Sequence, residues 1–160
     1  GEGQGVYISA VAAQLTGAEQ LAREHPDAAL AHLHLARLRD RAQSPQRCAP
    51  ELLAKLESLA SANAYALALR ARCEQAQGHS DNALQLSRRA LALAPQDPRH
   101  VLAHAELLYA QRACAELALL LERTRGHQND QGSATRLAQL ARCEAPDRTD
   151  QPQKTTAQEP

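Results

Sequence analysis

The stretch ARCEQAQGHSDNALQLSRRALALAP, which spans residues 71–95, decides how this chain folds. Small residues and turn-forming residues follow one another in it at steps of seven, five, seven and five: Ala71, Gly78, Ala83, Ala90 and Pro95. The pattern predicts two helices, over about 63–77 and 81–94, joined by a short turn. Glycine suits such a turn because it adopts left-handed backbone geometry without steric cost. Ser80 or Asp81 can cap the second helix through a side-chain oxygen.

The same features recur along the chain at a nearly constant interval. Ala36, Ala71 and Ala105 follow one another at steps of about 34 residues. Pro26 precedes Ala36 by ten residues, and Pro95 precedes Ala105 by ten. These intervals predict three helix pairs, over residues 29–63, 64–97 and 98–131.

The spacing over residues 26–131 resembles that of the tetratricopeptide repeat (TPR), a helix–turn–helix unit of about 34 residues. The resemblance implies an all-α fold: an α-solenoid of antiparallel helix hairpins, wound as a right-handed superhelix and closed by a C-terminal capping helix. Some positions depart from the family pattern. Arg70 and Glu74 stand where it prefers apolar and aromatic residues, Arg112 replaces the turn glycine, and Asn129 replaces the proline. A generic α-solenoid and an irregular helical bundle are the alternatives.

The composition also indicates an all-helical fold. Hydrophobic residues make up 44% of the chain and are mainly Ala and Leu, which favour helices. Apolar periodicity predicts a lead-in helix within residues 1–28, from about Val6 to Glu24, and a capping helix over 132–144. We interpret residues 1–5 as a linker and the polar segment 145–160 as a disordered tail.

Charge and hydropathy argue against two classes of partner. Lysine plus arginine equals aspartate plus glutamate, at 18 each, so the chain lacks the positive excess on which non-specific nucleic-acid binding depends. No apolar run approaches the length that spans a bilayer, and the start does not have the pattern of a signal peptide. These features favour a cytoplasmic protein, or a periplasmic one if the chain is a trimmed fragment.

The cysteines and histidines predict neither a disulfide framework nor a metal site. No two of the four cysteines have zinc-finger or CxxC spacing, so we expect each to be a small core residue or a half-exposed thiol. His100 and His104 lie one helical turn apart, which is half of a metal site, but no Glu lies between them. We expect both to be exposed polar residues, with a zinc-dependent activity as the alternative. No phosphate loop or nucleophile elbow occurs, so we expect no cofactor and no catalysis.

The resemblance implies a concave binding surface lined by the first helix of each pair. Carried onto this sequence, the surface is expected to present Leu33, Arg37, Tyr65, Arg72, Leu102, Glu106 and Tyr109. Exposed tyrosines are favoured binding anchors, although each tyrosine could instead pack between helices. Arg37 and Arg41 lie one turn apart and together could grip an acidic peptide.

The function that follows is a non-catalytic scaffold or adaptor that holds a peptide or helix of another protein in the groove. We expect no nucleic-acid partner and no insertion into a membrane. One alternative is a substrate-specific chaperone or assembly factor in bacterial secretion, pilus or envelope biogenesis, which the composition rich in Ala, Leu, Arg and Gln favours. A second alternative is a regulatory domain of a larger protein.

Overall fold

The computed structural model describes residues 2–125 and 131–144, and the regular elements in this part of the chain are all helices. They are α1 (Glu2–Glu24), α2 (Ala29–Arg41), the 3-10 helix η1 (Pro45–Cys48), α3 (Pro50–Leu59), α4 (Ala64–Ala76), α5 (Ser80–Leu93), α6 (Pro98–Ala110), α7 (Cys114–Arg123) and α8 (Gln131–Leu140). The predicted all-α class is therefore confirmed for the described residues. None of these helices is both long enough and apolar enough to cross a membrane. The predicted tail, residues 145–160, lies outside the described part.

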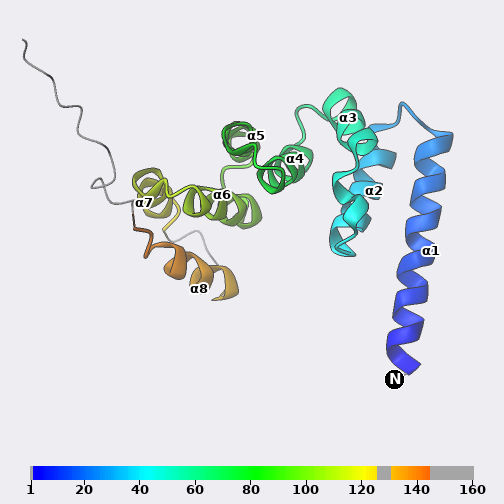
Figure 1. Cartoon of the computed structure of the whole chain (residues 1–160), viewed down its shortest axis with the longest axis horizontal. Helices are drawn as coiled ribbons and strands as arrows, with labels where there is room; N and C mark the ends of the chain where they lie inside the picture. Colours follow the sequence, from blue (N-terminus) through cyan, green and yellow to red (C-terminus); the bar gives the residue numbers. More distant parts are fainter. Residues whose placement is uncertain (1, 126–130, 145–160) are drawn as a thin grey trace, which may run out of the picture.

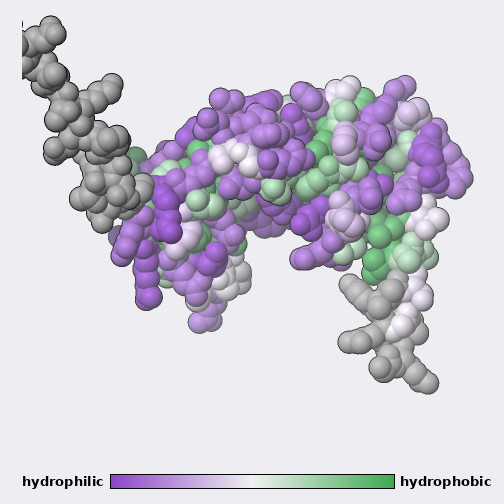
Figure 2. Space-filling model, viewed as in Figure 1, coloured by the Kyte–Doolittle hydropathy of each residue, from purple (hydrophilic) through white to green (hydrophobic). Residues whose placement is uncertain are grey.

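The helices form an elongated row that follows the order of the chain (Figure 1). From α1 to α7, each α-helix packs against the next one in sequence. Two further contacts skip one helix and join α4 to α6 and α6 to α8. We call α2, α4 and α6 the first helices, and α3, α5 and α7 the second helices. Figure 2 shows polar side chains over most of the visible face, with apolar groups gathered over α3 and along α1.

Side-chain caps begin two of the first helices. Asn63 Oδ1 accepts a hydrogen bond of 3.0 Å from the Ala66 amide of α4, and Asp97 Oδ1 accepts one of 3.0 Å from the Arg99 amide of α6. The predicted cap of α5 is wrong, because the helix starts at Ser80 itself and the preceding residue makes no side-chain capping bond. The predicted start of α1 is wrong as well. The helix begins at Glu2 and includes residues that we had interpreted as a linker.

Each first helix ends in the same left-handed turn. Gln43, Gly78 and Arg112 have φ values of 51°, 84° and 57°, and they recur at the same interval as the three alanines. In each turn the next amide bonds back to a carbonyl five residues earlier, at 2.9 Å: Ser44 to Arg39, His79 to Glu74 and Ala113 to Leu108. This is the Schellman arrangement, which satisfies carbonyls left open at a helix end. Only one of the three turns has the glycine that the conformation favours.

The same interval determines which side chains are buried. Ala36, Ala71 and Ala105 are 0%, 1% and 0% exposed. Ala36 packs in one cluster with Leu52 of α3, and Ala71 and Ala105 pack in the other with Leu86 of α5 and Leu120 of α7. On the second helices, the buried residues that recur at this interval are Leu52, Leu86 and Leu120.

Helix α4 belongs to two hydrophobic clusters. Leu69 and Cys73 pack in the cluster that α1, α2 and α3 build, whereas Leu67 and Ala71 pack in the cluster of α5 to α8. Opposite sides of one helix thus hold the two halves of the described structure together. On α2, Leu33 and Leu35 are buried in the cluster with α1 and α3, whereas Leu30 is 80% exposed.

Two disulfides join elements that are distant in sequence, so the expectation of unpaired cysteines is wrong. Cys48 of η1 bonds to Cys73 of α4, with the Cα atoms 5.6 Å apart. Cys114, at the start of α7, bonds to Cys143 beyond α8, with a Cα separation of 5.5 Å. The partners are 25 and 29 residues apart. No local spacing motif identifies such pairs, because the packing of the helices brings them together.

We expect glycine to stabilise the two left-handed turns that lack it. Gln43→Gly and Arg112→Gly should each raise the free energy of unfolding by about 1 kcal/mol, because a Cβ atom is costly in left-handed geometry. Gln77→Gly is the matched control at a right-handed C-cap and should lower the free energy by about 0.5–1 kcal/mol. Urea unfolding measures all three variants. A Gln43→Gly protein no more stable than the Gln77→Gly protein would contradict the turn assignment.

Removing either disulfide should destabilise the fold. Loops of 25 and 29 residues between the paired cysteines correspond to about 3 kcal/mol each in chain-entropy terms. We therefore expect Cys48→Ala/Cys73→Ala and Cys114→Ala/Cys143→Ala to unfold at clearly lower urea concentrations than the oxidised chain. Thiol titration of the denatured, unreduced protein is the direct check, and reactive thiols there would rule out the pairing.

Candidate functional site

Three of the predicted surface residues meet around one carboxylate, that of Asp40 at the end of α2. Arg72 donates a hydrogen bond from Nη2 to Asp40 Oδ2 at 2.8 Å, and the Tyr65 hydroxyl donates to the same oxygen at 3.1 Å. The Arg37 guanidinium lies over the Tyr65 ring, 5.1 Å from its centroid. Burial raises the pKa of Tyr65 to about 12, and the charge of Asp40 adds to the rise. The sequence thus found Arg37, Tyr65 and Arg72 but missed Asp40, which lies one turn after Arg37 on the same helix.

The C-terminal part of the predicted surface contains a second ion pair between helices. Arg136 of α8 donates from Nε to Glu106 Oε1 of α6 at 2.9 Å. Arg37, Arg72 and Glu106 recur at the repeat interval, and all three are exposed. We call the surface formed by Arg37, Asp40, Tyr65, Arg72, Glu106 and Tyr109 the first-helix face.

The apolar residues predicted for this surface lie deeper than the charged ones. Leu33 is 7% exposed and packs in the core, so it supports the face from below. Leu102 and Tyr109 are half-buried and pack against the other cluster. The Arg112 guanidinium lies 5.8 Å from the centroid of the Tyr109 ring. Both tyrosines of the face therefore pack between helices on one side and carry an arginine on the ring.

The histidine pair is buried, and the expectation of two exposed residues is wrong. His100 and His104 are 9% and 3% exposed. His104 Nδ1 shares a hydrogen bond of 2.8 Å with the buried Ser87 hydroxyl, and its Nε2 lies 3.9 Å from Glu116 Oε1. Burial lowers the pKa of both histidines. Among the described residues no group of three or more His, Cys, Asp or Glu side chains is placed to hold a metal ion.

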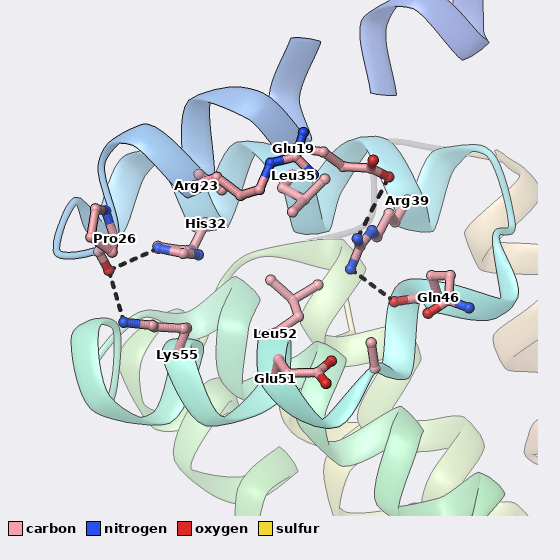
Figure 3. Close-up of a pocket in the computed structure, with 12 residues that line it drawn as sticks. Glu19, Arg23, Pro26, His32, Leu35, Arg39, Gln46, Glu51, Leu52 and Lys55 are labelled. Atoms are coloured by element: carbon pink, nitrogen blue, oxygen red, sulfur yellow. Dashed lines mark hydrogen bonds and ion pairs between the residues drawn. The ribbon is translucent and has the colours of Figure 1, made fainter. Parts of the chain in front are cut away.

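Two clefts lie between the helices. The first cleft, between α1, α2 and α3, has a volume of about 350 Å³ (Figure 3). The second cleft, between α5, α6 and α7, has a volume of about 480 Å³. Four residues of the first cleft have a counterpart in the second cleft at twice the interval that separates the three alanines. The pairs are Pro26 with Pro95, Leu35 with His104, Leu52 with Leu120, and Lys55 with Arg123. Sequence reasoning missed both clefts, since it considered only the face of the first helices.

An ion pair between α5 and α7 lies in the wall of the second cleft. Arg88 donates two hydrogen bonds to the carboxylate of Glu116, at 3.1 and 2.8 Å. These bonds lower the pKa of Glu116 and keep it charged. Ser87 is 4% exposed behind His104, so its hydroxyl does not reach the solvent. Ser87 and His104 therefore form a buried polar pair, with the partly exposed Glu116 beside it.

No protein-family model, no curated protein and no solved structure matches this chain. The function therefore has to be inferred from the side chains and surfaces of the chain itself.

The buried histidines should make the fold acid-sensitive. An unfolded histidine has a pKa of about 6.5. In the folded chain burial lowers the pKa of His104, and the charges of Arg88 and Arg123 lower it further. The charge of Glu116 raises this pKa, but by less than burial lowers it. Below about pH 6.5 the unfolded chain binds more protons than the folded chain, so the free energy of unfolding falls as the pH falls. Urea unfolding between about pH 5 and pH 8 measures this dependence.

His104→Asn should reduce the acid sensitivity, because asparagine keeps a polar group near Ser87 without titrating. His34→Asn makes the same chemical change at an exposed position of α2 and should retain the acid sensitivity of the parent chain. Equal pH dependence in the parent and the His104→Asn variant would show that this histidine is not buried in the neutral form.

Proposed function

We propose that this chain is a TPR-like α-solenoid and acts as a non-catalytic protein-binding scaffold. Its first-helix face receives a peptide or helix of a partner protein. The proposal of a repeat fold is supported by the three left-handed turns and the three buried alanines, which recur at one shared interval. It is also supported by contacts that join α4 to α6 and α6 to α8.

The observation that carries the functional proposal is the arrangement of charge on the first-helix face. Ion pairs between helices, Asp40 with Arg72 and Glu106 with Arg136, link α2 to α4 and α6 to α8. Arg37 is exposed and stacks on Tyr65, without a carboxylate partner among the described residues. An exposed arginine on an aromatic ring is a good contact for a partner's carboxylate, because the guanidinium is already oriented.

The two disulfides favour a second candidate function, that of an assembly factor or chaperone in the bacterial envelope. Disulfides form and persist in oxidising compartments such as the periplasm and are rare in the cytosol. Cys48–Cys73 and Cys114–Cys143 therefore favour a periplasmic location over the cytoplasmic one that the sequence features favoured. Co-expression separates the two candidates: an assembly factor should keep its client soluble, whereas an adaptor should leave the solubility of its partner unchanged.

Reversing charge on the first-helix face should weaken partner binding. We expect Arg37→Glu/Arg72→Glu to lower the affinity for partners captured from the native organism at least tenfold, a loss of about 1.4 kcal/mol. The fold should persist, because an exposed ion pair such as Arg72–Asp40 contributes only about 0–1 kcal/mol. Quantitative mass spectrometry of the captured proteins measures partner binding, and circular dichroism checks that the variant is folded.

Arg142→Glu, an exposed charge reversal beyond α8, is the matched control and should retain the same partners. If Arg37→Glu/Arg72→Glu captured them as strongly as the Arg142→Glu protein, the first-helix face would not be the binding surface.

A further inference from the structure

The first cleft combines an apolar floor with positive charge at its edges. Leu35 of α2 and Leu52 of α3 lie in its middle, both buried (Figure 3). Arg39 lies toward one end, and Lys55 lies beside Pro26 at the other. Arg23 reaches in from α1. Glu19 and Glu51 line the same cleft, so the three cations leave its walls with a net positive charge around the apolar floor.

The cations of the first cleft are incompletely neutralised by the chain itself. Lys55 Nζ donates to the Pro26 carbonyl at 3.0 Å and has no carboxylate partner among the described residues. Arg39 Nη2 lies 3.6 Å from Glu19 Oε1, which is longer than a hydrogen bond. Arg39 Nη1 donates to the Gln46 carbonyl at 3.2 Å, while its Nε is buried without any hydrogen-bond partner. Arg23 makes no ion pair within the described part of the chain.

A buried donor without a partner is costly, because it has lost water and gained no acceptor in return. The second cleft provides the comparison. There Arg88 donates two hydrogen bonds to Glu116, whereas Arg123 donates only to the Leu119 carbonyl, at 3.4 Å. In both clefts at least one wall cation therefore has no carboxylate partner among the described residues.

We propose that the first cleft binds a segment of a partner protein in which a carboxylate side chain lies next to an aliphatic one. The aliphatic group covers Leu35 and Leu52, and carboxylates pair with Lys55 and Arg23 at the rim. The carboxylate nearest α2 also attracts the Arg39 guanidinium and accepts a hydrogen bond from its Nε–H, which has no partner within the described chain. The inference rests on the proposed protein-binding function but uses a different surface from the first-helix face, so that one cleft and one face hold separate parts of a partner.

A pair of labelled peptides tests this assignment. One is a ten-residue peptide of alternating leucine and aspartate, and the other has asparagine in place of every aspartate. Fluorescence anisotropy against the full chain should show binding of the acidic peptide, at least tenfold weaker binding of the amide peptide, and loss of affinity with added salt. Equal binding of both peptides, or no binding of the acidic peptide at millimolar protein, would overturn the proposal.

Charge-reversal variants locate the site. Lys55→Glu and Arg23→Glu should each lower the affinity of the chain for the acidic peptide at least fivefold. Arg142→Glu, which lies outside the cleft, should leave that affinity unchanged. Both rim variants alter side chains outside the hydrophobic core, and circular dichroism confirms that they fold. Unchanged affinity in folded Lys55→Glu and Arg23→Glu proteins would overturn the proposal.

The Arg37→Glu/Arg72→Glu variant separates this inference from the proposed function. It should bind the acidic peptide as the parent does while losing the partners captured through the first-helix face. If it lost the peptide and the Lys55→Glu protein retained it, the first-helix face would be the acidic-segment site and the cleft proposal would fail. If it retained both peptide and partners while Lys55→Glu lost them, the proposed role of the first-helix face would fail and the cleft proposal would stand.

Discussion

The burial of three alanines between helices is the constraint on which the rest of this structure depends. Ala36, Ala71 and Ala105 are all but inaccessible to solvent, and a larger side chain at any of them would push the second helix of the pair away. Because the next helix packs directly against it, each first helix has to end within one turn so that the chain can reverse direction. The left-handed turns at Gln43, Gly78 and Arg112 accomplish this with the same backbone bonds, whatever the side chain.

Paired helices without phenylalanine or tryptophan bury little apolar surface per residue, so other interactions have to add to the stability of the fold. The two disulfides each tie one pair to the next element, Cys48–Cys73 from η1 to α4 and Cys114–Cys143 from α7 to the segment after α8. Helix α4 places opposite sides in two hydrophobic clusters and so joins them. The Ser87–His104 hydrogen bond is buried between α5 and α6, and its expected cost is sensitivity to acid, because burial lowers the pKa of His104.

The charged residues divide into those that hold the fold and those that remain free to bind. Asp40, Arg72, Glu106 and Arg136 connect helices across the first-helix face, and Arg88 with Glu116 closes the edge of the second cleft. Arg37 on that face, and Lys55 with Arg23 at the first cleft, lack carboxylate partners among the described residues. A net charge of zero therefore conceals local surfaces of unsatisfied positive charge. Both proposed binding surfaces favour an acidic segment for this reason.

The sequence by itself determined the helical class and the turn at Gly78, and it singled out Tyr65 and Arg72, which bond to Asp40, and Arg37, which stacks on Tyr65. These features depend on local propensity and on periods of a few residues, which a single chain displays directly. Only the tertiary structure decided that the cysteines pair, that His100 and His104 are buried, and that Gln43 and Arg112 take a conformation typical of glycine. It alone revealed the first cleft, whose walls come from three helices. The disulfides join residues 25 and 29 apart, and His104 bonds to Ser87 across 17 residues. The packing of the helices, and not the spacing along the chain, brings such residues together.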